Sequence, residues 1–146
     1  MTRRSRAREV ALQVMYGDDV NPTRNLTVVD EFVAQRLGGD APLLAFTNEL
    51  VGGVRRNRQE LDAWLSDLAQ NWSLSRMAVL DRNILRLAAF EIVYTGTPGQ
   101  VVINEAVELA KRFGSKQSSQ FVNGILDRLM KEHAAGKNSH SDTAHQ

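Results

Sequence analysis

The spacing of apolar residues constrains the fold of this chain more than any other feature of its sequence. Apolar residues recur every three or four positions, as on the buried stripe of an α-helix, and do not alternate as in a half-buried strand. Near the N-terminus this stripe consists of Ala7, Val10, Ala11, Val14 and Met15. The one β-branched run, at 101–103, leads directly into another helical pattern. The sequence therefore predicts an all-α fold.

Seven segments carry this spacing, and their ends coincide with residues that cap or break helices. The expected helices cover roughly 7–17, 27–37, 40–57, 61–71, 73–94, 102–113 and 118–132. Thr27 and Asp40 are suited to cap the second and third helices, and Gly114 is placed to end the sixth in a left-handed conformation. The fifth segment is apolar on most sides, so we expect it to be central and largely buried.

The chain has 146 residues, of which 42% are apolar and 24% charged, as is typical of one globular domain. Short connections predict antiparallel helices, packed either as one bundle or as two sub-bundles divided near residues 72–75. The polar segment 133–146 shows no apolar periodicity. We expect it to be a disordered tail.

The sequence also indicates where the protein resides. No apolar run approaches the roughly 18 residues of a membrane span, and no signal-peptide core follows the basic N-terminus. The absence of cysteine agrees with a reducing compartment. We therefore expect a cytoplasmic protein without a membrane partner.

Residues of the common catalytic and metal sites are missing or misplaced. The chain has no cysteine, and its histidines lie at the end of the last helix or in the polar tail: His133, His140 and His145. Nucleophilic Ser-His or Cys-His arrangements and the usual helical metal motifs are therefore not expected. Gly52 and Gly53 lack the spacing of a phosphate-binding loop, and close helix packing explains them better. The sequence predicts a protein that is not an enzyme and needs no cofactor or metal.

Charged residues on the later helices have a structural interpretation. Glu105 lies near the start of its helix, where negative charge complements the helix dipole. Glu108 can pair with Lys111 or Arg112 along the helix surface. The charged residues of the fifth helix are expected to fix the register between helices: Arg82, Arg86 and Glu91.

The N-terminus carries the clearest functional signal. The net charge is only +1, yet four arginines precede and enter the first helix: Arg3, Arg4, Arg6 and Arg8. Positive charge at a helix N-terminus opposes the dipole by about 0.3–1 kcal/mol per group, so stability alone does not favour this cluster. Together with Tyr16 it forms a candidate RNA-binding strip, because arginine contacts phosphates and aromatic rings stack on bases. A flexible basic tail is the structural alternative.

A second basic and polar patch follows the sixth helix: Lys111, Arg112, Lys116, Gln117, Ser118, Ser119 and Gln120. It surrounds Phe113 and Phe121, and either ring could stack on an unpaired base, a contact worth about 1–3 kcal/mol. We expect Phe113 to belong to the core. For Phe121, a core position and an RNA-binding position are equally compatible with the sequence.

Several sequence blocks also resemble a known family. They are RRSRAREVALQVMY at 3–16, DRNILRL at 81–87 followed by Glu91, VINEAVELAK at 102–111, and Phe113-Gly114 followed by FVNGIL at 121–126. In their order and spacing these blocks resemble the signature of the NusB family over nearly the whole chain, excluding the tail.

The resemblance implies one helical domain, 1–132, of about seven helices in two three-helix sub-bundles, about 1–72 and 73–132. It implies transcription antitermination on ribosomal RNA operons, where the family binds single-stranded boxA RNA with the ribosomal protein NusE in the transcription elongation complex. By position, the RNA-binding residues would be Arg3, Arg4, Arg6, Arg8, Tyr16, Gln117, Gln120 and Phe121. Asp81 would lie on the side that faces NusE.

Two alternatives compete with this interpretation. Some ribosomal RNA methyltransferases carry a NusB-like domain, but the chain is expected to be too short for a catalytic half and has no nucleophilic cysteine. The other alternative is a self-associating helical protein, since some family members form homodimers that would mask the basic surface.

Overall fold

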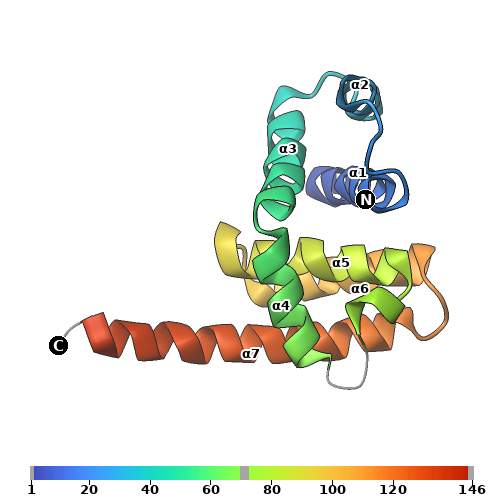
Figure 1. The fold of residues 1–146 in the computed structure, drawn as a ribbon. Coiled ribbons are helices and arrows are strands. Elements are labelled where there is room, and N and C mark those ends of the chain that lie inside the picture. Colours follow the sequence, from blue (N-terminus) through green and yellow to red (C-terminus); the bar gives the residue numbers. More distant parts are fainter. Residues whose placement is uncertain (1, 70–72, 145–146) are drawn as a thin grey trace.

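The computed structural model describes residues 2–69 and 73–144, and none of them lies in a β-strand. Helices follow one another along the described chain, with one 3₁₀ turn and one π-helical turn between them (Figure 1). The elements are α1 (Arg3–Val20), α2 (Leu26–Arg36), α3 (Ala41–Arg56), α4 (Arg58–Leu68), η1 (Leu74–Arg76), α5 (Val79–Phe90), η2 (Glu91–Thr95), α6 (Gly99–Phe113) and α7 (Ser118–Ala144). The predicted all-α fold with about seven helices is confirmed.

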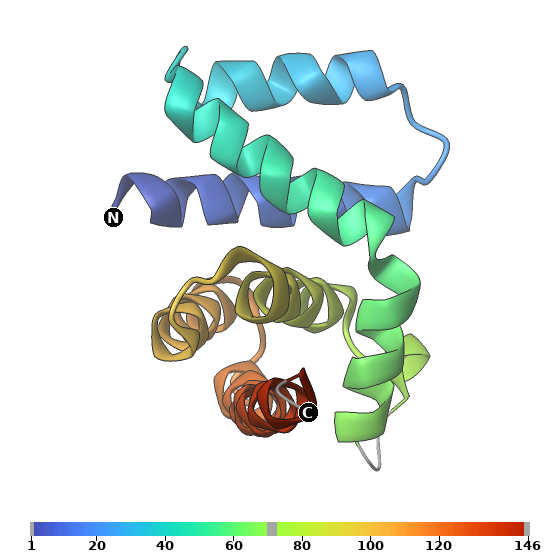
Figure 2. The ribbon, with the colours of Figure 1, turned by 90° about the vertical axis from the view of Figure 1, so that its left-hand side faces the viewer.

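The helices form two packed groups that meet along α1 and α5. In Figure 2, α1, α2 and α3 form the upper group, and α5, α6 and α7 lie below it with α4 alongside. Helix α4 therefore lies with the lower group, whereas the sequence analysis placed residues up to about 72 in the first sub-bundle. The reason is that α4 buries Leu61, Leu65 and Leu68 and packs against α5 and α7. Residues 70–72, where the fourth helix was expected to end, lie outside the described residues.

Helix α5 is the central element, as predicted. It packs against α1, α3, α4, α6 and α7, and every residue from Asn83 to Phe90 is buried. Its contact with α3 is close because Gly53 has no side chain there: an added Cβ would lie 2.0 Å from Cζ of Phe90. Close helix packing thus explains Gly53.

The helix ends correct two expectations and confirm a third. The side chain of Asp40 accepts a hydrogen bond from the backbone N–H of Leu43 and caps α3, as predicted. Asn25, not Thr27, caps α2. Gly114 is extended and not left-handed, with φ −93° and ψ −172°. A Cβ at Gly114 would lie 2.6 Å from Oγ of Ser118, so glycine is needed there for close approach.

The last helix is longer than the sequence predicts. Helix α7 continues to Ala144, whereas a disordered tail was expected from His133. Extending a helix that is already formed requires no new nucleation, which allows polar residues to continue it. None of the described helices combines the length and apolar character needed to cross a membrane.

Candidate nucleic-acid interface

The four N-terminal arginines lie in different environments. Arg3, Arg4 and Arg6 are exposed on the first two turns of α1. Arg3 donates to Oδ2 of Asp40, and Arg6 donates to the backbone carbonyl of Arg36 at the end of α2. The guanidinium of Arg4 lies 4.4 Å from the centre of a phenylalanine ring on α3. These three cations remain accessible to an anionic ligand.

Arg8 is buried, in contrast to its prediction as an RNA-binding residue. Its side chain is 4% exposed and donates two hydrogen bonds to the carboxylate of Glu91, at 2.7 and 2.9 Å. Burial alone would lower the pKa of Arg8, but the hydrogen bonds and charge of Glu91 raise it. Arg8 therefore holds α1 against the end of α5 and does not form part of the surface strip.

An open cleft lies beside Tyr16, between α1, α5 and α6. It encloses about 370 Å³, and its lining includes Leu12, Gln13, Leu80 and Phe113. Tyr16 is 45% exposed and Phe113 is 42% exposed. The expectation that Phe113 belongs to the core is therefore wrong.

A second, smaller cavity brings together residues that the sequence assigned to two different partners. It encloses about 200 Å³ between η1, the first turn of α5 and the connection from α6 to α7. Asp81, Gln117 and Phe121 all contribute to its lining. Phe121 is partly buried against the core, which combines the two positions considered for it. Leu80 lines the first cleft and Asp81 the second, so the first turn of α5 contributes to both.

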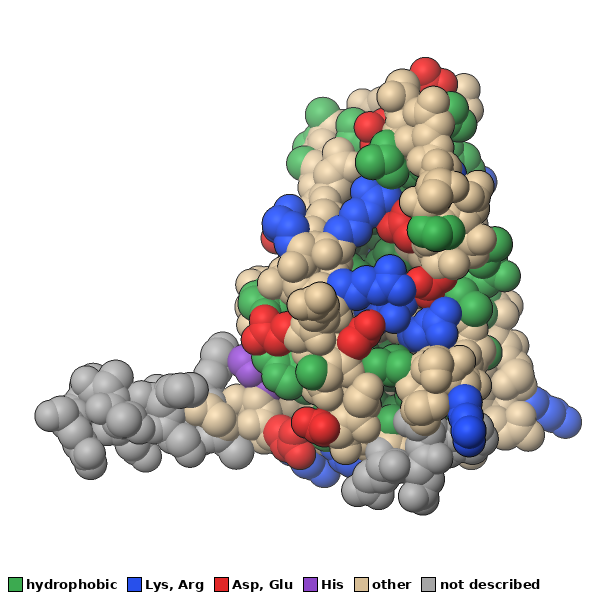
Figure 3. All heavy atoms as spheres, viewed as in Figure 1, with side chains coloured by type: hydrophobic (Ala, Val, Ile, Leu, Met, Phe, Trp, Pro, Cys, Tyr) green, Lys and Arg blue, Asp and Glu red, His purple; other side chains and the backbone are tan. Residues whose placement is uncertain are grey.

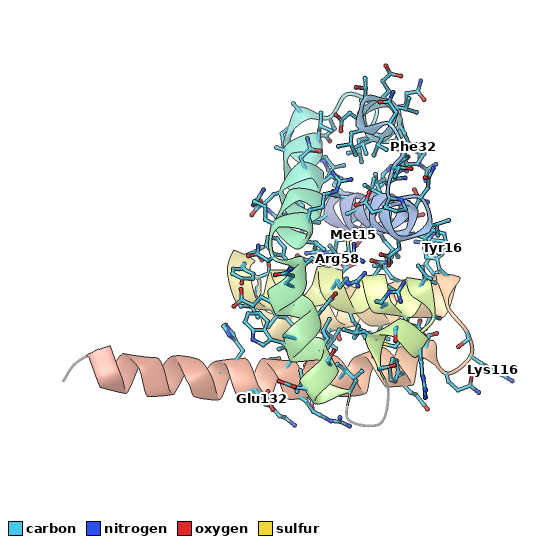
Figure 4. All side chains as sticks on the ribbon, viewed as in Figure 1. Met15, Tyr16, Phe32, Arg58, Lys116 and Glu132 are labelled. Atoms are coloured by element: carbon cyan, nitrogen blue, oxygen red, sulfur yellow. The ribbon has the colours of Figure 1, made fainter. Side chains whose placement is uncertain are left out.

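The remaining predicted residues lie around these cavities. Gln120 is exposed on the first turn of α7. Figure 4 shows Tyr16 and Lys116 at the same edge of the molecule, the first near the end of α1 and the second in the turn between α6 and α7. This edge therefore combines aromatic rings, amides and cations, as binding sites for single-stranded nucleic acid do.

A charged junction fixes the helices that carry the interface. Asp19 of α1 accepts hydrogen bonds from Arg58, Arg82, Asn83 and Arg86, at 2.6–3.2 Å. Basic and acidic side chains gather over this region in the middle of the face shown in Figure 3. Burial alone would raise the pKa of Asp19, but Asn83 and the three arginines lower it to about 2.

The predicted tethering role of Arg82, Arg86 and Glu91 is confirmed by these ion pairs. The partner of Glu108 was also predicted, since Nζ of Lys111 lies 4.0 Å from its carboxylate. Asp19 itself was not identified from the sequence. Its only signal was its place beside the buried stripe of α1.

Gln13 is a further residue that sequence analysis missed. Its side-chain Oε1 is buried without a hydrogen-bond partner, and the residue lines the cleft beside Tyr16. A glutamine on a helix surface carries no special signal. Among the described residues, no group of histidine or acidic side chains could hold a metal ion.

The arrangement of helices defines the structural class of the protein. A solved structure of NusB from T. maritima matches it with a TM-score of 0.81 and 34% identity, covering 92% of this chain and 94% of that one. A structure of the antitermination factors NusB and NusE in complex with dsRNA matches with a TM-score of 0.80 and 26% identity, covering 90% and 98% of the two chains.

The sequence comparisons give the particular family. A family model described as the NusB family matches residues 5–131. The transcription antitermination protein NusB of Elusimicrobium minutum is 41% identical over 140 residues, covering 94% of this chain and all of that one. The corresponding protein of Geotalea uraniireducens is 42% identical, covering 88% and 94%. The chain belongs to the NusB family.

Proposed function

We propose that this protein is a transcription antitermination factor that binds the boxA element of ribosomal RNA transcripts together with the ribosomal protein NusE. Membership of the NusB family supports this function, as does the similarity to a NusB in a complex with NusE and RNA. The protein acts within the transcription elongation complex and therefore in the cytoplasm. Its role is binding and not catalysis.

The observation that carries the RNA-binding role is the pair of cavities to which the first turn of α5 contributes. The exposed rings of Tyr16 and Phe113 flank one of them, and Gln117 and Phe121 line the other. Single-stranded RNA is bound by stacking its bases on aromatic rings and by placing its phosphates on cations. Arg3, Arg4 and Arg6 supply cations on the first turns of α1. Gln120 extends the surface along α7.

NusE binds beside this surface, at the edge of the second cavity where Asp81 lies. A composite surface of two proteins makes RNA binding tighter than either protein achieves alone, because the two sets of contacts act on one strand. Self-association through the same surface is the competing possibility, and it would mask the RNA site. Sedimentation of the protein with and without NusE distinguishes a homodimer from a heterodimer.

Titration of labelled single-stranded boxA RNA at several salt concentrations tests the function. Each phosphate contact to a single strand contributes about 0.7 to the slope of log affinity against log salt. Replacing Arg4 and Arg6 by alanine should therefore weaken binding and reduce this slope by about 1.4. NusE should tighten binding of the wild-type protein.

A charge-matched double variant, Arg56→Ala with Lys131→Ala, is the control, because both side chains are exposed and neither lines the two cavities. It should retain most of the affinity. Equal affinities and slopes for the two double variants would show that the N-terminal arginines do not bind RNA.

A further inference from the structure

The first turn of α1 is linked to α6 by a chain of hydrogen bonds that ends on Glu105. Oγ of Ser5 lies 2.8 Å from both carboxylate oxygens of Glu105 and 2.7 Å from Oγ1 of Thr2. The backbone N–H of Ser5 donates to the same Oγ1 of Thr2, at 3.0 Å, and Thr2 thereby caps the helix. The cap of α1, its first turn and α6 therefore belong to one network.

The carboxylate of Glu105 sets the direction of the hydrogen bonds in this network. A carboxylate only accepts hydrogen bonds, so the single hydroxyl proton of Ser5 is donated to Glu105. The hydroxyl of Ser5 then accepts from the hydroxyl of Thr2, which keeps a lone pair for the backbone N–H of Ser5. Glu105 thus stabilises the capped form of the first turn.

A negative charge at this place is unfavourable for binding RNA. Arg3, Arg4 and Arg6, which are assigned to RNA phosphates, are exposed on the same turns of α1 as Ser5. The side chain of Glu105 is 25% exposed, and it lines a cleft of about 310 Å³ together with Ser5. A carboxylate so close to this surface repels phosphate. We therefore looked for a benefit to RNA binding that outweighs the repulsion.

The benefit lies in a contact that does not compete with RNA. Arg3 and Arg6 also link the first two turns to other parts of the protein, the start of α3 and the end of α2. Those links use exposed guanidinium groups, which RNA phosphates would draw away. The hydrogen bond from Ser5 to Glu105 is partly buried and uses no cation. It therefore still holds the first turn when the arginines bind phosphate.

The rest of α1 is held independently of Glu105. Arg8 donates two hydrogen bonds to Glu91, at 2.7 and 2.9 Å, whereas its Nη1 atom is 3.8 Å from Glu105. Beyond this point α1 packs against α3 and α5. Loss of Glu105 should therefore loosen the first turn and leave the fold intact.

We propose that Glu105 is a positioning residue for RNA binding. Through Ser5 it holds the first turn of α1 in the form that presents Arg3, Arg4 and Arg6 to the RNA backbone. The inference rests on the proposed function, because it concerns the cations that bind RNA in that function. An acidic side chain thus increases the affinity for a polyanion.

The test compares Glu105→Ala with Glu108→Ala in the full chain, by fluorescence anisotropy with labelled boxA RNA. Both carboxylates are on α6 and line the same cleft, but Glu108 is 66% exposed and pairs with Lys111 instead of α1. Glu108→Ala loses a repulsive charge and should bind up to about twofold more tightly than wild type. Glu105→Ala loses the same charge, yet it should bind about threefold to tenfold more weakly, as expected for a loosened helix cap.

Further variants separate positioning from a general loss of stability. Glu105→Gln keeps an oxygen that accepts from Ser5, so it should retain most of the wild-type affinity. Ser5→Ala breaks the same contact from α1 and should weaken binding as Glu105→Ala does. Combining Ser5→Ala with Glu105→Ala should weaken binding no further, because both substitutions remove one contact. Thermal unfolding checks that each variant is folded, and Ser5→Ala keeps the test decisive if Glu105→Ala is not.

The possible results are distinguishable. If Glu105→Ala binds RNA as tightly as wild type or as Glu108→Ala, Glu105 does not position the arginines, although RNA binding stands. If the effects of Ser5→Ala and Glu105→Ala add in the double variant, the contact between them is not the link, and the proposal is equally wrong. If wild type does not bind boxA RNA with or without NusE, the proposed function and this inference fail together.

Discussion

Arg4 and Arg8 lie one turn apart on the same helix, yet only the first remains on the surface. Arg8 is in line with Ala11, Leu12 and Met15, which are all buried. This face of α1 carries Arg8 into the interior, where Glu91 neutralises it. The density of arginine in the sequence does not distinguish these two roles, whereas the helical position of each residue does.

Arg8→Ala should destabilise the protein by about 3–5 kcal/mol, because it leaves the carboxylate of Glu91 buried without a partner. The double substitution Arg8→Met with Glu91→Leu should recover most of this loss, since no unpaired charge remains. Urea denaturation followed by circular dichroism measures both changes. A stable Arg8→Ala variant with weakened RNA binding would instead return Arg8 to the interface.

The pKa of Asp19, about 2 against an ordinary value of 3.8, predicts how stability depends on pH. Because the folded state lowers this pKa, the contribution of Asp19 is fully present above about pH 4 and is lost as the pH falls towards 2. Asp19→Asn should be less stable than wild type at neutral pH, with a smaller loss of stability between pH 4 and 2. Denaturation at a series of pH values checks this.

The control for this experiment is Asp67→Asn, which removes an exposed carboxylate. It should keep the wild-type loss of stability between pH 4 and 2. If Asp19→Asn loses as much stability between pH 4 and 2 as this control, the junction at Asp19 does not determine how stability falls in acid.

The candidate site was only partly predictable at this scale. Exposed arginines near the N-terminus, and Gln117 and Gln120 after α6, follow from composition and position. Phe113 was assigned to the core, but it is the last residue of α6 and is 42% exposed. Asp19 acts through partners that are distant in sequence, and Gln13 lines a cleft that residues of three helices form. Spacing along the chain reveals neither.

Helix positions were largely predictable because each buried face repeats at helical spacing over several turns. Helix ends were less so. The first helix was expected to stop near Gly17, but it continues to Val20, and an added Cβ at Gly17 would meet the guanidinium of Arg24. Gly96 does end the π-helical turn, with φ of 72°. Tertiary contacts, more than local propensity, decided the ends that were misplaced.

Two glycines within helices should respond oppositely to alanine. Gly53→Ala places a methyl group against the ring of Phe90 at the contact between α3 and α5, so it should destabilise the protein by about 1–3 kcal/mol. Gly124→Ala in α7 meets open space and should stabilise the protein by up to about 1 kcal/mol through helix propensity. Thermal unfolding of both variants measures the difference. Equal effects would mean that α3 and α5 are not held in close contact.

The two groups of helices share one apolar core, although the sequence suggested a division near residues 72–75. Buried residues from α1, α3, α5 and α7 belong to one cluster, which includes Val10, Leu50, Ile84 and Leu126. The position of α4 was not predictable. Its apolar stripe predicts that one face is buried, but it does not indicate which helices cover that face.

A shared core predicts that the protein unfolds in one cooperative step. Scanning calorimetry should give a single transition with equal calorimetric and van't Hoff enthalpies. The expected enthalpy is on the order of 100 kcal/mol near 60 °C, from about 0.7 kcal/mol per residue. Two separate transitions would show that α1–α3 and α4–α7 are independent units.

The junction at Asp19 has a consequence for exchanging parts between relatives. One carboxylate from α1 forms ion pairs with arginines from α4 and α5. The upper group of helices therefore supplies the acidic side chain, and the lower group supplies the basic side chains. A chimaera that takes α1–α3 from a relative with an uncharged residue at position 19 would leave Arg86, 5% exposed, with only its contacts to Asp62 and Asn83. The two halves of such a protein must therefore be inherited as a compatible pair.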